Sequence, residues 1–145
     1  THSNHDVNHV RSLMVLLRGL DYLFTAAGAA SIADKLYVVV GSDFGRTPYY
    51  NEGNGKDHWN VTSMMISGPG VAGGRVVGAT DDKFKAMRVN PATLELRPDL
   101  EQDGPDGTRI TTSAIHQSLR TLAGIGADAA VQRYALPGAP LPLFG

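Results

Sequence analysis

Aspartate and histidine residues lie on either side of a loop in the middle of the chain. Asp43 comes just after an apolar run at residues 36–40, and His58 follows a loop rich in glycine and asparagine. Carboxylate oxygens and imidazole nitrogens are ligands of divalent metals, and a flexible loop allows the two groups to meet. Ligands bind at the carboxyl ends of strands in open α/β sheets, which is where Asp43 falls. The arrangement therefore predicts a metal site.

Each residue near this site also has a simpler structural interpretation. Asp43 could cap the turn after the strand, and His58 could pack beside Trp59. Arg46 could offer its planar guanidinium to a phosphate or sulfate oxygen, or it could form a salt bridge with a nearby carboxylate. Asp57 could orient His58 without ligating the metal itself, or it could cap a turn. The sequence leaves these alternatives open.

The N-terminal stretch THSNHDVNH holds three of the five histidines. Its imidazoles and Asp6 could ligate a divalent metal such as zinc, or the stretch could be an exposed polar end that caps the next helix. Thr1 offers a weaker alternative, an N-terminal nucleophile whose own amine serves as the base. Ser42 and Ser67 both lack the Gly-x-Ser-x-Gly context of a nucleophile elbow. The sequence thus provides metal-ligand types without a convincing nucleophile.

The elements that must position these groups follow from hydrophobic periodicity. Apolar residues at three- and four-residue steps predict a helix over 10–27, and the β-branched run at 36–40 predicts a strand buried on both faces of a parallel sheet. A second strand is expected at 61–67. A helix followed by a buried strand is half of a βαβ unit, so a parallel strand should precede it. Too few strands are present for a complete doubly wound domain.

The second half of the chain is less regular. Residues 71–80 read as a short edge strand or a loop, and 81–107 as an irregular segment with one short strand near 94–96. Thr111 or Thr112 should cap a helix that ends at Gly124. A short helix is expected after it, through Tyr134.

Composition limits the classes of partner. The 145 residues are enough for one domain, and 13 basic residues against 14 acidic ones leave a net charge of -1, so no basic surface favours nucleic acid. The absence of cysteine excludes disulfides and zinc-thiolate sites. No uninterrupted apolar run reaches the roughly 20 residues that span a bilayer, so neither a membrane span nor a signal peptide is expected.

Two stretches closely resemble a known family: SDFGRTPYYNEGNGKDHW and, after it, GPGVAGGRVVGATD. They resemble the C-terminal half of the exported bacterial proteins grouped as domain of unknown function 1501, which are similar to the alkaline phosphatase and sulfatase superfamily. The opening THSNHD resembles that family's Asp-Thr-His segment, and TTSAIHQSLRTLAGI resembles its last core helix. PLPLFG is similar to a family ending. The resemblance covers essentially the whole chain.

This resemblance implies a fold and an activity. Residues 1–145 would be the C-terminal part of a single α/β domain, an alkaline-phosphatase-like three-layer sandwich with a mostly parallel sheet. The domain would be incomplete without its N-terminal part, which would also supply the nucleophile. The complete protein would be a metal-dependent hydrolase of small phosphate or sulfate esters, exported to the periplasm.

The resemblance also assigns site residues. Asp43 falls at the strand-end metal carboxylate, His58 at the later metal histidine, and His2 in the segment that supplies ligands to another metal. The metal would be divalent, with zinc, calcium and manganese as candidates. Phe44 departs from the pattern, because many superfamily members carry histidine directly after that aspartate. The departure favours an alternative function, a non-catalytic binding or scaffold protein on a degenerate phosphatase-like fold.

Overall fold

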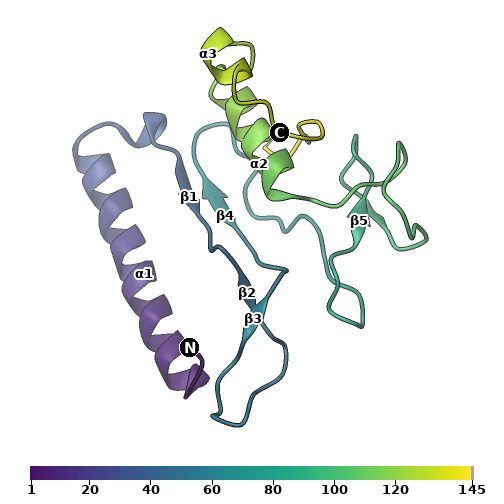
Figure 1. Cartoon of the computed structure of the whole chain (residues 1–145). Helices are drawn as coiled ribbons and strands as arrows, with labels where there is room; N and C mark the ends of the chain where they lie inside the picture. The colour runs from purple at the N-terminus through teal and green to yellow at the C-terminus, as the bar shows by residue number, and fades with distance from the viewer. Residues whose placement is uncertain (145) are drawn as a thin grey trace. The chain divides into compact units, whose positions relative to one another are not determined.

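A computed structural model describes residues 1–144 of the chain, which divide into two compact units (Figure 1). The first unit ends at Val71 and the second begins at Ala72, and each is described by itself. The first unit contains α1 (His5–Ala29), the short 3-10 helix η1 (Ala33–Lys35), β1 (Val38–Val40), β2 (Gly45–Arg46), β3 (His58–Trp59) and β4 (Met65–Ser67). The second contains β5 (Arg88–Val89), β6 (Leu96–Arg97), α2 (Thr112–Leu122) and α3 (Ala129–Gln132).

The strands form three separate two-stranded sheets, and every pair is antiparallel. β1 pairs with β4, β2 with β3, and β5 with β6. In the first sheet Val39 lies opposite Ile66. Each of these strands is only two or three residues long.

The predicted three-layer sandwich with a mostly parallel sheet is therefore wrong for this chain. A parallel partner for β1 would need a crossover connection, usually a helix, on one face of the sheet. The residues between β1 and β4 form the β2–β3 pair instead, so the chain returns antiparallel to β1. The prediction that this strand is buried on both faces also fails, because Val39 is 41% exposed. The β-branched run indicated a strand correctly but not its partner.

Helix α1 confirms the predicted helix and begins at His5, earlier than the apolar periodicity suggests. Its apolar side chains are exposed around much of its circumference, with Val7 73% and Leu17 58% exposed. By length and composition α1 is the one helix within residues 1–144 that could cross a membrane, a property that signal sequences and core helices of soluble proteins share. The expectation of no membrane span stays a prediction.

The second unit is built around the β5–β6 pair and α2. Val89 is fully buried in β5, and the neighbouring Arg88 is held by the Asp103 carboxylate at 2.7 Å. Helix α2 begins at the predicted cap, where the Thr111 hydroxyl accepts a hydrogen bond from the Ala114 amide. The C-terminal tail returns to this helix, because the Ser118 hydroxyl donates to the Leu141 carbonyl at 2.8 Å. This unit contains none of the residues predicted to bind metal.

Candidate metal centre

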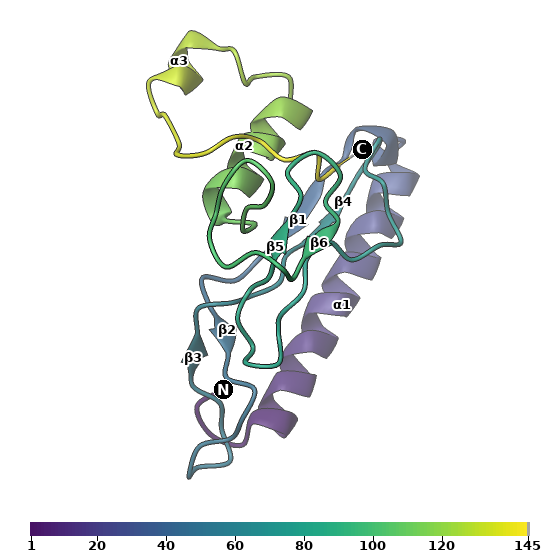
Figure 2. The same ribbon diagram turned by 90° about the vertical axis from the view of Figure 1, so that its right-hand side faces the viewer.

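The N-terminal segment lies along the loop between β2 and β3, next to the start of α1 (Figure 2). Backbone hydrogen bonds hold it there: the Lys56 amide donates to the Thr1 carbonyl at 3.1 Å, and the His5 amide donates to the Asn54 carbonyl at 2.8 Å. The Asn4 amide donates to the Gly53 carbonyl at 3.2 Å. These contacts bring residues near the start of the chain beside residues about fifty positions later.

Two glycines permit the close backbone approaches on which this arrangement depends. A Cβ atom at Gly55 would lie 1.9 Å from the carbonyl oxygen of His2, so no other residue fits there without moving the N-terminal segment. A Cβ atom at Gly45 in β2 would lie 1.8 Å from the carbonyl oxygen of Val61. In the β2–β3 pair Gly45 lies opposite Trp59, and Arg46 lies opposite His58. The pair therefore holds Arg46 and His58 next to each other.

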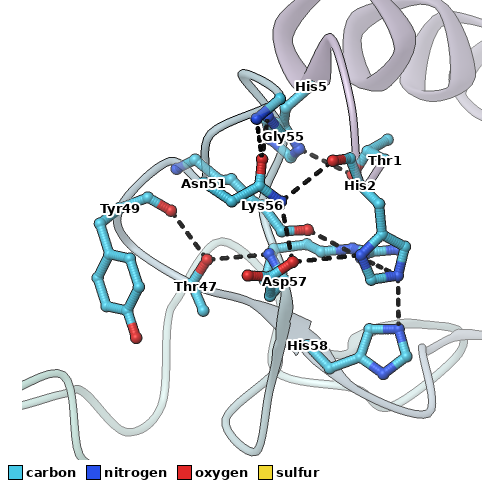
Figure 3. Close-up of polar contacts among 12 residues, drawn as sticks. Thr1, His2, His5, Thr47, Tyr49, Asn51, Gly55, Lys56, Asp57 and His58 are labelled. Carbon is cyan, nitrogen blue, oxygen red and sulfur yellow. Dashed lines mark hydrogen bonds and ion pairs between the residues drawn. The ribbon is translucent and has the colours of Figure 1, made fainter.

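The imidazole of His2 lies between a carboxylate and a second imidazole (Figure 3). Its Nδ1 is 3.3 Å from Oδ1 of Asp57, and its Nε2 is 3.1 Å from Nε2 of His58. The side chains of His2 and Asp57 are 59% and 55% exposed. The three side chains thus form an open cluster at the surface of the first unit.

The hydrogen-bond partners define which nitrogen of His2 carries a proton. A carboxylate only accepts hydrogen bonds, so Nδ1 of His2 donates to Asp57. Nε2 of His2 is then an acceptor, and it faces two donors: Arg46 through Nη1 at 3.4 Å and the Nε2–H group of His58. Arg46 is fixed in turn by the Lys56 carbonyl, to which it donates at 3.0 Å. The lone pair of His2 Nε2 therefore points to the centre of the cluster.

Electrostatic surroundings favour a neutral His58 and an ionised Asp57. Partial desolvation lowers the pKa of His58 below its usual value, and the nearby His2 and Arg46 lower it further. Hydrogen bonds from Asn51 and then His2 lower the pKa of Asp57. His58 is accordingly held neutral and Asp57 ionised over a wider pH range than in a free peptide.

Aromatic contacts define the outer side of the cluster. The Phe44 ring stacks on the His58 ring with centroids 3.6 Å apart, and the Arg46 guanidinium lies 5.2 Å from the centre of the Phe44 ring. Phe44, the residue that departs from the expected pattern, therefore supports the imidazole of His58. The packing of His58 beside Trp59, one interpretation of the sequence, stays a prediction.

The structure brings four of the five predicted site residues together. His2, His58, Asp57 and Arg46 contact one another directly or through one intermediate. Asp57 contacts His2, whereas the sequence suggested His58 as its partner. Asp43 lies exposed between β1 and β2, and within residues 1–144 no three histidine, aspartate or glutamate side chains converge as metal ligands. The role of Asp43 as a metal ligand stays a prediction.

Asn51 is the site residue that the sequence analysis missed. Its side chain reaches the loop, the N-terminal segment and Asp57 at once. The sequence holds one signal of this: Asn51 is followed by Gly53 and Gly55, and asparagine side chains in turns accept hydrogen bonds from amides a few residues on. This signal indicates a turn, but it does not show that Nδ2 of Asn51 would donate to His2 and Asp57.

The fold and the site define a small mixed α and β protein with an imidazole–carboxylate cluster on its surface. A family model described as "Protein of unknown function (DUF1501)" matches residues 1–101, which include every residue of the cluster. The chain belongs to this family. Neither the curated proteins nor the solved structures include a match to the chain.

Proposed function

We propose that the chain forms part of a divalent-metal centre in a hydrolase of phosphate or sulfate esters, with His2 and His58 as metal ligands. One observation carries the proposal: the two Nε2 atoms lie 3.1 Å apart. Two nitrogens on one zinc ion, each at about 2.0–2.1 Å, must be closer than the sum of these two bonds. The observed separation is shorter than that sum.

The environment of His2 supports the same role. Ligating histidines commonly donate their other N–H group to a carboxylate, which fixes the tautomer and raises the basicity of the ligating nitrogen. Asp57 occupies that position behind His2. His58 would ligate through the Nε2 atom that carries a proton in the metal-free cluster, so binding of the metal requires this neutral ring to carry its proton on Nδ1 instead. Imidazole ligands favour zinc, and to a lesser extent manganese, over calcium.

A bound divalent ion would polarise an ester oxygen and lower the pKa of a bound water. Arg46 is placed to receive the oxyanion of the substrate, because it lies beside His2 with no carboxylate partner in residues 1–144. Its guanidinium carries two edges of donors, and the contact to the Lys56 carbonyl uses only part of them. Arg46 would thus bind the phosphate or sulfate group while His2 and His58 hold the metal.

The finer assignment, to an alkaline-phosphatase-like or sulfatase-like activity in the periplasm, rests on the resemblance of the SDFG and DHW segments. The role of Asp43 as the carboxylate ligand rests on this resemblance alone. The nucleophile would come from outside this chain.

A second candidate function is binding without catalysis. It is favoured by the absence, within residues 1–144, of a third convergent metal ligand. In that case Arg46 and the exposed cluster would recognise an anionic group without reaction.

The proposal is tested by zinc content and by ester hydrolysis. Elemental analysis after zinc loading and desalting should find one zinc per chain, lost in His2→Ala and His58→Ala but kept in His116→Ala, whose imidazole is exposed on α2 of the second unit. The full-length family protein should hydrolyse a nitrophenyl phosphate or sulfate in a zinc-dependent manner. Zinc without hydrolysis of either ester would favour the binding function, and no zinc would refute the metal centre.

A further inference from the structure

Asn51 uses both ends of its side-chain amide in the structure. Its Oδ1 atom accepts hydrogen bonds from the Gly53 amide at 3.0 Å and the Gly55 amide at 2.9 Å. Its Nδ2 atom donates to the His2 carbonyl at 3.1 Å and to Oδ1 of Asp57 at 2.9 Å. One half-buried side chain therefore joins the loop, the N-terminal segment and the carboxylate of the cluster.

The donor end of Asn51 acts on the histidine that we assign as a metal ligand. The oxygen of Asp57 to which Asn51 donates is the same Oδ1 atom that accepts from Nδ1 of His2. Asn51 also holds the main chain of His2 through its carbonyl. The side chain thus sets both the position of His2 and the direction of the oxygen that fixes its tautomer.

We propose that Asn51 is the positioning residue of the metal centre: it holds His2 and Asp57 so that Nε2 of His2 presents its lone pair to the metal. The inference rests on the proposed function of His2 and His58. Asn51 itself is not a ligand, because its four hydrogen bonds occupy both of its polar atoms.

Asn51→Asp separates the positioning role from the loop structure. The new carboxylate keeps an oxygen that can accept from the Gly53 and Gly55 amides, but it cannot donate to His2 or Asp57 and it faces a second negative charge. Asn54→Asp is the matched control, since it adds the same charge to the same loop. Asn54 contacts His5 through its backbone carbonyl alone.

Two measurements decide the role. In the metal-free chain, ¹⁵N chemical shifts should show His2 protonated at Nδ1 in the unchanged chain and in Asn54→Asp, and shifted toward the Nε2–H tautomer in Asn51→Asp. Zinc affinity should fall about 10–100-fold in Asn51→Asp, as expected for loss of a group that supports a ligand, and change less than about twofold in Asn54→Asp.

An unchanged His2 tautomer in Asn51→Asp would overturn the positioning role, as would an unchanged zinc affinity. If the unchanged chain bound no zinc, the proposed function would fail, while the tautomer of His2 would still decide whether Asn51 positions this side chain. Far-ultraviolet circular dichroism of each variant is the control that checks whether α1 is retained.

Discussion

The exclusion of any side chain at Gly55 gives the sharpest test of how the site is assembled. In Gly55→Ala the new Cβ would lie 1.9 Å from the His2 carbonyl oxygen and 2.0 Å from its carbonyl carbon. Ordinary contact begins at 3.4 Å, so the N-terminal segment and the loop must separate by about 1.5 Å. The obstacle is backbone on both sides, which no change of side-chain rotamer relieves.

The expected losses follow from this separation. The hydrogen bonds from Lys56 to Thr1 and from Asn51 to His2, both 3.1 Å, would lengthen beyond useful range. At about 0.5–1.5 kcal/mol each, the two bonds account for about 1–3 kcal/mol of the free energy of unfolding. Zinc affinity should fall about 10–100-fold, because His2 moves away from His58.

Gly53→Ala is the control for this prediction. It makes the same substitution two positions earlier, where the nearest atoms to a new Cβ are 3.5 Å away. Zinc affinity would be measured by competition with a chromogenic chelator, and unfolding by chemical denaturation. Equal zinc affinity and equal stability in the two variants would refute the argument that the backbone contact at Gly55 assembles the site.

Three further substitutions test separate parts of the account. Arg46→Met removes a positive charge 3.4 Å from His2 Nε2, so zinc should bind more tightly and sulfate more weakly in calorimetry; unchanged sulfate binding would contradict the assignment. Burial lowers the pKa of His5, so the unfolded chain binds the proton more readily and stability should fall as the pH drops below about 6.5. His5→Asn should make denaturant midpoints less pH-dependent over this range, whereas an equal slope would exclude His5. Thr111→Ala removes the cap of α2 and should cost about 0.5–2 kcal/mol in thermal unfolding, whereas no loss would show that the cap is dispensable.

Local patterns in the sequence predicted local structure well. Apolar residues at helical spacing located α1, and the Thr111 hydroxyl caps α2 as its position before an apolar periodic run suggested. Both features depend on interactions within a few residues of each other along the chain. Such short-range interactions can be predicted from the order of neighbouring residues.

Strand pairing could not be predicted in the same way. The run at 36–40 indicated a strand, but its neighbour is determined by where the chain returns, and residues 41–64 form no crossover helix. The β2–β3 pair was missed because strands of two residues show no alternation of apolar and polar side chains. An apolar strand is compatible with several partners, so its composition alone did not exclude a parallel sheet.

The sequence predicted the residue types of the candidate site, but not the contacts that join the N-terminal segment to the loop between β2 and β3. Histidine and aspartate before Trp59 signalled metal chemistry, and the structure places His2 beside them. The docking of the N-terminal segment depends on Asn51 and Gly55, whose contacts lie about fifty residues away in the sequence. No spacing rule relates positions so far apart.

The central claim is that His2 and His58 bind the same metal ion through their Nε2 atoms. The most direct test is a zinc titration of the chain with ¹⁵N-labelled histidine, followed through the imidazole nitrogen shifts. The account predicts that the Nε2 resonances of His2 and His58 shift together and reach their end point at one equivalent of zinc, with both rings protonated at Nδ1. An Nε2 resonance of either histidine that does not respond to zinc would contradict it.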